Sequence, residues 1–274
     1  MQYATSVTIM WATSSYHAEA GVKMETEIRG EVVRLASLLT GPTSPARLMG
    51  GLAIWLASET VRTPTFERPY GDLDLVARLK DRPAVQALLE AEGYAPDRRF
   101  NTMYGAQRLY YSAPGRAWTV DVIFDKLDMS HSLDLRERLG GPGATLPLAD
   151  LLLSKLQIWE INRKDVADAL CLLADHPISQ SGEEVIDLGR ITRVLGSDWG
   201  FGHAVERNLG RVAELAKEIQ PAGTPYDPVA QVAALMDAID AAPKSLAWKA
   251  RARVGERLQW YDTPEEVEHP GPIQ

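Results

Sequence analysis

Two aspartates separated by a single residue stand in the otherwise apolar segment "DLDLVARL", which begins at Asp72. A charge in apolar surroundings is costly unless a partner compensates it. The segment is predicted to be a strand, and side chains alternate along a strand, so Asp72 and Asp74 share one face while Leu73 and Leu75 share the other. The pair therefore presents acid from one face of a sheet.

A second predicted strand, "TVDVIFD", adds carboxylates from one of its faces, at Asp121 and Asp125. We favour Asp121 as the third acid because it precedes the densest apolar stretch, with Asp125 as its rival. Three carboxylates that converge repel each other and raise their own pKa values unless a cation neutralises them. Mg²⁺ is the hard, oxygen-seeking ion that such groups hold, and it leaves positions for phosphate oxygens. The structural alternative is that each aspartate only ends a strand or caps a turn.

The elements around these acids occur in a particular order. The turn Gly50-Gly51 in "MGGLAIWL" comes first, "RPYGDLDLV" follows, and "VDVIF" comes later. This order resembles the signature of the DNA polymerase β-like nucleotidyltransferase superfamily. The branch typified by AbiEii toxins is more similar still, since its start "GGLA" followed by R-x-T-x-D-h-D (h is apolar) matches Gly50 to Ala53, then Arg68, Asp72 and Asp74.

A later block extends the resemblance to about residues 47–174. It is "LPLADLLLSKLQIWEINRKDVADALCLL", with a lysine on one helix and Arg-Lys-Asp-x-x-Asp on the next. The matching positions are Lys155, Arg163, Lys164, Asp165 and Asp168. Two departures are present: Tyr70 replaces the usual threonine, and 20 residues separate Gly51 from Asp72. Both bear on acceptor preference more than on metal binding.

The resemblance implies a role for each matching residue. The backbone of Gly50 and Gly51 would approach a nucleoside triphosphate closely, helped by the following helix dipole. Asp72, Asp74 and Asp121 would hold Mg²⁺, and Asp121 could also deprotonate an acceptor hydroxyl. The remaining nucleotide-binding positions would be Arg68, Lys155, Asp165 and Asp168, with Lys155 neutralising phosphate charge and acting in catalysis.

Each of these positions also has a plainer interpretation. The glycines could only shape a loop, Lys155 could be a surface lysine with a buried stem, and Arg68 could be a solvated loop charge. Asn162 stands where a helix N-cap belongs, and Asp165 follows three residues later, so Asp165 could reciprocate the cap.

The resemblance implies an Mg²⁺-dependent enzyme that transfers a nucleoside monophosphate from an NTP to a hydroxyl and releases pyrophosphate. For the AbiEii-like branch it implies the toxin of a toxin–antitoxin pair, acting on tRNA, with an antitoxin protein as partner. The first alternative is a nucleotidyltransferase with a small-molecule acceptor of the antibiotic type. The second is a non-catalytic nucleotide-sensing or RNA-binding protein with the same fold.

Composition narrows the class of protein. At 274 residues the chain is longer than a typical single domain, so two parts are expected. The net charge of −8 argues against a protein that coats nucleic acid by charge alone. A lone Cys171 in an apolar helical pattern reads as a buried hydrophobe and suits a cytoplasmic protein. No apolar run is long enough for a membrane span, so no membrane partner is expected.

We expect an α+β fold: a nucleotidyltransferase core with a small mixed β-sheet flanked by helices, followed by a C-terminal helical region. Residues 1–24 are expected to be a flexible tail, 25–147 the core and 148–274 the helical domain, with Met24 as an alternative start. Pro114 and Gly115 predict a type II turn in a hairpin over 107–125. Helices are predicted over 25–41, 52–58, 82–93, 148–160, 163–174, 183–195, 203–219, 227–241 and 245–260.

The C-terminal segment "PKSLAWKARARVGERLQWY" alternates cations with tryptophans, Trp248 and Trp260. Such a stretch could bind RNA through phosphates and stacking. We favour a solvated helix face over a tryptophan-containing core. The cations are Lys244, Lys249, Arg251, Arg253 and Arg257. The five histidines are dispersed, and none is assigned a role.

Overall fold

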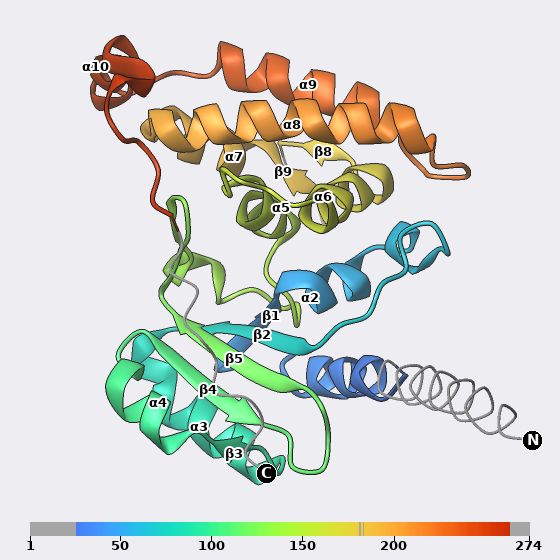
Figure 1. Cartoon of the computed structure of the whole chain (residues 1–274), viewed down its shortest axis with the longest axis vertical. Helices are drawn as coiled ribbons and strands as arrows, with labels where there is room; N and C mark the ends of the chain where they lie inside the picture. The colour runs from blue at the N-terminus through green and yellow to red at the C-terminus, as the bar shows by residue number, and fades with distance from the viewer. Residues whose placement is uncertain (1–25, 181, 183, 264–274) are drawn as a thin grey trace, which may run out of the picture.

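The computed structural model describes residues 26–180, 182 and 184–263 (Figure 1). The predicted tail over residues 1–24 and the alternative start at Met24 lie outside the described residues. Within the described part the chain is an α+β protein, with a mixed sheet low in the view of Figure 1 and a stack of helices above it. The predicted fold class, a small mixed sheet flanked by helices and followed by a helical region, is confirmed.

The main sheet has the strand order β1-β2-β5-β4-β3. Strand β2 pairs with β5 in parallel, and every other neighbouring pair is antiparallel. The strands of this sheet are β1 (Ala46–Met49), β2 (Asp72–Ala77), β3 (Ala95–Pro96), β4 (Arg108–Ser112) and β5 (Thr119–Phe124). Two small sheets add β6 (Lys126–Asp128) with β7 (Ser132–Asp134), and β8 (Ile178–Ser179) with β9 (Ile186–Asp187).

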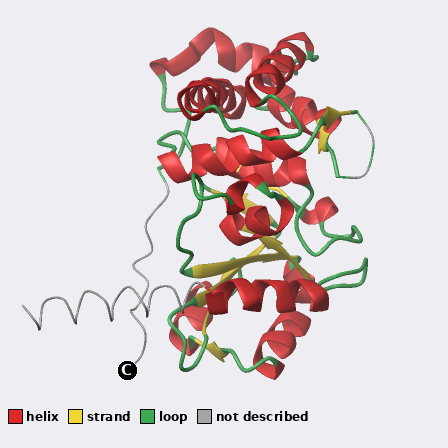
Figure 2. Ribbon diagram, turned by 90° about the vertical axis from the view of Figure 1, so that its right-hand side faces the viewer, coloured by secondary structure: helices red, strands yellow, loops and turns green. Residues whose placement is uncertain are grey.

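Helices cover the sheet unevenly. A helix over residues 26–38, α3 (Arg82–Ala91) and α4 (Arg98–Tyr104) lie on one side, while α2 (Gly50–Ala57) lies on the other, between the sheet and the helical stack (Figures 1 and 2). Helix α3 buries one apolar stripe, whereas α2 is apolar on all sides and packs against both the sheet and the helical stack. In the helix over 26–38 the predicted stripe is fully buried at Ile28, Val32 and Leu35, and the predicted Leu39, just after the helix ends, is fully buried as well.

The helical stack follows the sheet in the chain. The helices of the stack are α5 (Leu148–Leu156), α6 (Arg163–Asp175), α7 (Leu188–Ser197), α8 (Trp199–Ile219), α9 (Pro228–Ala241) and α10 (Leu246–Val254). Helix α2 packs against α5 and α6, and α8 packs against α6 and α9. Whether the parts before and after residue 148 are separate domains stays a prediction.

The β4–β5 hairpin forms as predicted. Gly115 has φ +73°, and the amide of Arg116 donates to the carbonyl of Ala113 at 3.0 Å, which is the geometry of the Pro114-Gly115 turn. Cys171 is fully buried in α6, as its apolar pattern indicated. Three 3-10 helices add to the part before residue 148: η1 (Thr60–Arg62), η2 (Leu79–Asp81) and η3 (Arg136–Arg138).

Several predicted helix bounds are wrong. The helix predicted over 148–160 ends at Leu156, the one over 183–195 runs from Leu188 to Ser197, and the one over 203–219 begins at Trp199. For the last two, the cause is local. Asp187 and Asp198 each accept a hydrogen bond from the backbone amide three residues on, so each is an N-cap that fixes where its helix starts.

The helix predicted over 245–260 is also wrong in its second half. Helix α10 ends at Val254, and a 3-10 turn η4 (Gly255–Arg257) follows, because Gly255 has φ +60°. Trp260 instead packs edge-on against Trp159, with ring centroids 4.4 Å apart. Arg251 lies over the ring of Trp199. The cations left exposed on this segment are Lys249, Arg253 and Arg257. They are solvated, as favoured from the sequence, but the tryptophan-containing core predicted beneath them is not found among the described residues, because α10 contains no buried residue and Trp248 and Trp260 are only partly buried.

None of the helices in the described residues combines the length and the apolar character that crossing a lipid bilayer demands.

Candidate active site

The three predicted acids lie on one face of two adjacent parallel strands. In the β2–β5 register Asp74 pairs with Asp121, and Asp72 pairs with Thr119. Neighbouring strands are about 4.8 Å apart. The side chains of Asp72, Asp74 and Asp121 therefore converge from strand positions that are nearly 50 residues apart in the sequence. Asp72 is exposed at the start of β2, and Asp121 is only 8% exposed.

The electrostatic environment of Asp74 is unfavourable for a negative charge. Burial raises the pKa of Asp74, and the charges of Asp72 and Asp121 raise it further, to about 8. Lys155 and Arg108 oppose this shift and do not outweigh it. A strand in the centre of a mixed sheet thus carries a carboxyl that the protein alone does not stabilise in its ionised form.

Arg108 is a site residue that the sequence interpretation missed. From β4 its Nε donates to both oxygens of Asp121, at 2.7 and 2.8 Å, and its Nη2 also donates to Asp121 Oδ2. These hydrogen bonds raise the pKa of Arg108 although burial opposes the charge. A signal was present in the sequence: in a hairpin closed at Pro114-Gly115, Tyr110 pairs with Asp121, and Arg108 lies two residues along on the same face.

Gly50 brings the start of α2 against Asp74. It directly follows Met49, which pairs with Asp74 in the β1–β2 register. Gly50 has φ +71°, and a Cβ at this position would lie 1.9 Å from Asp74 Oδ2. No side chain among the described residues caps the first turn of α2. Only glycine permits this conformation and this close approach together.

Lys155 lies on α5 and reaches two aspartates of α6. Its Nζ is 2.7 Å from Asp165 Oδ1 and 3.0 Å from Asp168 Oδ2. Burial favours the neutral amine, but Asp168 and Asp165 outweigh it, and the pKa of Lys155 is raised. The side chain is 12% exposed, so the plainer interpretation as a surface lysine is wrong.

Arg68 joins the same network from the loop before β2. Its Nη2 donates to both oxygens of Asp168, at 3.0 and 2.7 Å, and the carboxylate of Asp168 is almost fully buried. The guanidinium also lies over the ring of Tyr70, 4.4 Å from its centroid. A Cβ at Gly51 would lie 2.7 Å from Arg68 Nη2. Arg68 is therefore held between α2 and α6 and is not a solvated loop charge.

The capping interpretation of Asp165 is confirmed alongside its pairing with Lys155. The amide of Asp165 donates to Asn162 Oδ1 at 2.9 Å, and Asn162 Nδ2 donates to Asp165 Oδ2 at 2.7 Å. This reciprocal arrangement starts α6 at Arg163. The orientation of Asp165 toward Lys155 is thus fixed by the helix start.

Asp125, the rival third acid, lies outside the group. It has φ +63°, and its Oδ1 accepts a hydrogen bond from the amide of Leu79 at 3.1 Å. Its side chain therefore joins the residue that follows β5 to the segment that follows β2. The choice of Asp121 over Asp125 agrees with this geometry.

The donors at this site fit a hard divalent cation in their chemistry. Asp72 and Asp74 offer carboxylate oxygens, and a cation would relieve the unfavourable ionisation of Asp74. In the conformation described, however, no group of three or more histidine, cysteine, aspartate or glutamate side chains among residues 26–180, 182 and 184–263 is arranged to hold a metal ion. In that conformation both oxygens of Asp121 accept hydrogen bonds from Arg108.

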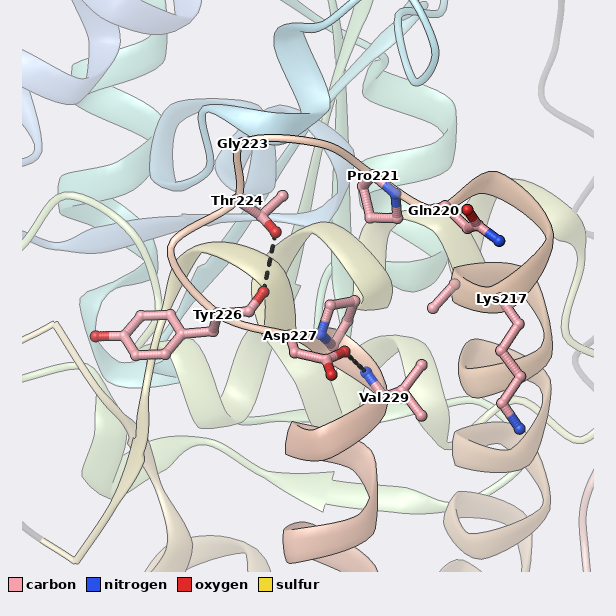
Figure 3. Close-up of a pocket in the computed structure, with 10 residues that line it drawn as sticks. Lys217, Gln220, Pro221, Gly223, Thr224, Tyr226, Asp227 and Val229 are labelled. Atoms are coloured by element: carbon pink, nitrogen blue, oxygen red, sulfur yellow. Dashed lines mark hydrogen bonds between the residues drawn. The ribbon is translucent and has the colours of Figure 1, made fainter.

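A separate hollow lies at the far end of the helical stack, in the loop that joins α8 to α9 (Figure 3). Lys217, Tyr226 and Asp227 are among its lining residues. Asp227 accepts a hydrogen bond from the amide of Val229 and so caps α9. No residue predicted for the nucleotide site lines this hollow.

Comparisons with known proteins do not assign this chain to a family. No protein-family model matches the chain, and no curated protein matches it. Among solved structures, a weak likeness is found to the lincosamide antibiotic adenylyltransferase LnuA with lincomycin bound, at 13% identity and a TM-score of 0.31. The match covers 45% of this chain and 82% of that chain. The AbiEii-like branch therefore stays a prediction from the sequence motifs.

Proposed function

We propose that this protein is an NTP-dependent nucleotidyltransferase that moves a nucleoside monophosphate to a hydroxyl and releases pyrophosphate. One observation carries the proposal. Asp72, Asp74 and Asp121 share one face of the β2–β5 pair, next to a glycine turn that opens a helix against Asp74. Carboxylates grouped beside a glycine turn at a helix start suit the transfer of a phosphoryl-type group.

The glycine turn is proposed to receive the triphosphate. The backbone amides at the start of α2 would bind phosphate oxygens, while Asp74 fills the space that a Cβ would take at Gly50 and Arg68 fills that at Gly51. The positive end of the α2 dipole favours an anion at the same place.

Asp72 and Asp74 are proposed to hold Mg²⁺. When bound, this ion would neutralise phosphate charge and orient the phosphates for attack. Asp121 as a third ligand, or as the base that takes the proton of the acceptor hydroxyl, remains a prediction from the sequence resemblance. Positioning and electrostatics supply most of the rate in such transfers, so no covalent enzyme intermediate is invoked.

Lys155 is proposed to supply positive charge beside Asp74. It is one of the two cations whose charge opposes the pKa rise of Asp74. Asp165, Asp168 and Arg68 would hold Lys155 in place from α6 and from the loop before β2. In this proposal the α5–α6 unit completes the nucleotide site from above the sheet (Figure 1).

An RNA hydroxyl is the acceptor that we propose first, as part of the AbiEii-like toxin reading with tRNA as the substrate and an antitoxin as partner. This choice of acceptor is supported by the sequence motifs of the AbiEii-like branch, from Gly50 to Asp74 and from Lys155 to Asp168. A small hydroxylated molecule is the alternative acceptor for the same chemistry.

Transfer can be tested by incubating the protein with each α-³²P-labelled NTP, Mg²⁺ and total RNA, with and without a panel of small hydroxylated compounds. We expect label on RNA. Label found only on small molecules would select the alternative acceptor. NTP binding that requires Mg²⁺ but is followed by no labelled product would favour the non-catalytic nucleotide-binding protein.

The matched variants are Asp74→Asn in the acidic group and Asp128→Asn on β6, whose carboxylate is exposed and pairs with Lys126. We expect Asp74→Asn to lose transfer by at least ~100-fold, because a metal-binding carboxylate is removed. Asp128→Asn should retain transfer. Unchanged turnover in Asp74→Asn would remove the metal assignment.

A further inference from the structure

Arg108 engages both oxygens of Asp121 at once. Its Nε lies 2.7 Å from Oδ1 and 2.8 Å from Oδ2, and its Nη2 donates to Oδ2 as well. The planar guanidinium matches a carboxylate in this way, and the resulting pair has a fixed geometry as well as a favourable charge. The negative charge of Asp121 is thus already neutralised by a cation of the same chain.

This pair lies in the acidic group itself. Asp121 is opposite Asp74 across the parallel strands, and the charge of Asp74 contributes to the raised pKa of Arg108. If Asp121 turned to a metal ion, Arg108 would lose its partner while its side chain is still largely buried, at 31% exposure. The positive charge of Arg108 neutralises the negative charge of Asp121. The carboxylates left without such a partner are Asp72 and Asp74, and their two negative charges equal the charge of one divalent cation.

We propose that Arg108 withholds Asp121 from the divalent cation, so that Asp72 and Asp74 alone bind the cation and Arg108 is a positioning residue for Asp121. The inference rests on the proposed cation site. It departs from the expectation that all three aspartates are metal ligands. In its place, the guanidinium of Arg108 is the cation that neutralises Asp121, whether or not a metal ion is bound.

Binding of Mn²⁺ alone, counted by electron paramagnetic resonance at pH 8.5 without nucleotide, tests the inference. The key variant is the double substitution Arg108→Gln with Asp121→Asn, which removes the pair while leaving the net charge of the site unchanged. We expect its Mn²⁺ affinity to stay within about threefold of wild type, whereas Asp74→Asn should weaken binding by at least ~10-fold, as loss of a ligand does. Thermal melts check that each variant is folded.

A second readout uses the wild-type chain. In a ¹⁵N-labelled protein, the Nε–H resonance of Arg108, assigned by its disappearance in Arg108→Lys, reports the hydrogen bond to Asp121. We expect this resonance to persist, with little change in position, when Mg²⁺ is added to saturation. This measurement holds even if the double variant fails to fold.

The outcomes separate the two proposals. A loss of ~10-fold or more in Mn²⁺ affinity in the folded double variant, or disappearance of the Arg108 resonance on adding Mg²⁺, would overturn the role of Arg108 and leave the cation site standing. Equal Mn²⁺ affinity in wild type and Asp74→Asn would instead remove the cation site of the proposed function.

Discussion

The Cα of Gly50 stands so close to the carboxylate of Asp74 that a Cβ added to it would lie 1.9 Å from Oδ2. The contact joins the turn that opens α2 to β2, the second strand of the sheet. Gly50 also has φ +71°, a conformation that side chains disfavour by about 1–2 kcal/mol. Two separate requirements, conformation and space, therefore select glycine here.

Gly115→Ala separates the two requirements. Gly115 has φ +73°, and nothing among the described residues lies within 4 Å of a Cβ built there. We expect Gly115→Ala to cost only the conformational term of about 1–2 kcal/mol. Gly50→Ala should cost more and should also weaken Mn²⁺ binding, because Asp74 must move. Urea unfolding and Mn²⁺ titration measure both effects, and equal unfolding costs for the two variants would show that Asp74 tolerates the methyl group.

The raised pKa of Asp74 predicts a pH dependence of stability. Its ordinary value is 3.8, and burial with Asp72 and Asp121 raises it to about 8 in the folded protein. Since the folded state then binds this proton more tightly than the unfolded chain, the stabilisation is complete below about pH 4 and is lost as pH rises through 8. In EDTA, Asp74→Asn should melt near the wild-type Tm at about pH 4 and above it at about pH 8.5.

The control for this pH series is Asp240→Asn, an exposed position on α9. Its Tm should follow wild type at every pH. Adding Mg²⁺ at high pH should raise the Tm of wild type more than that of Asp74→Asn, because only the wild type presents both carboxylates. A difference in Tm between Asp74→Asn and wild type that does not change with pH would contradict the shifted ionisation.

The convergence of the acids was predictable because it depends on local rules. A period of two residues fixes which side chains share a strand face, so Asp72, Asp74 and Asp121 could be assigned to one face each before the sheet was known. The adjacency and parallel pairing of β2 and β5, with Asp74 opposite Asp121, were not predicted, because the sequence resemblance implied only that the three acids hold one metal ion. A different local rule, the 3.6-residue period of a helix, predicted the buried stripe that includes Val32.

The partners of these residues were not predictable in the same way. Arg68 and Asp168 are 100 residues apart, and their contact depends on how α6 docks over α2. The hairpin could have placed Arg108 on the same face as Asp121, but the carboxylate that Arg108 contacts depends on the β4–β5 register. Helix α4 was not predicted, because the short segment that starts at Arg98 has no long apolar repeat. The β6–β7 pair was not predicted either, since each of its strands has only three residues. The sequence therefore predicted local conformation better than it predicted contacts between residues far apart in the chain.

Asp168→Asn tests how much the ion pairs of Asp168 with Arg68 and Lys155 contribute to stability. The carboxylate of Asp168 is shared by Arg68 and Lys155, and it is almost fully buried. Removing its charge leaves two cations with too little compensation, and breaking a buried pair typically costs about 3–5 kcal/mol. We expect a decrease of that order in the free energy of unfolding, measured in urea at pH 7.

The matched control is Glu218→Gln, which breaks the exposed pair of Glu218 with Arg163 on the surface of the same helical stack. Solvent screens that pair, so little change in stability is expected. Comparable losses in Asp168→Asn and Glu218→Gln would mean that the buried network contributes no more than a surface pair.

Tyr70, which stands where the AbiEii-type pattern has threonine, is predicted to support the site without meeting the acceptor. It is 4% exposed, its ring lies under the guanidinium of Arg68, and its hydroxyl has no hydrogen-bond partner among the described residues. Tyr70→Phe should therefore keep or slightly raise stability, by up to about 1 kcal/mol, because it removes a buried unpaired hydroxyl. Tyr70→Thr should lose about 3 kcal/mol through the cavity that replaces the ring.

The two substitutions together distinguish packing from acceptor recognition. If Tyr70 acts only by packing against Arg68, Tyr70→Phe keeps the same acceptor and the same KM for it, while Tyr70→Thr lowers the free energy of unfolding and leaves the choice of acceptor unchanged. Competition assays with RNA and small hydroxylated compounds measure that choice. A change of acceptor in Tyr70→Phe, whose ring still supports Arg68, would place the Tyr70 hydroxyl in contact with substrate and require the loop before β2 to open during turnover.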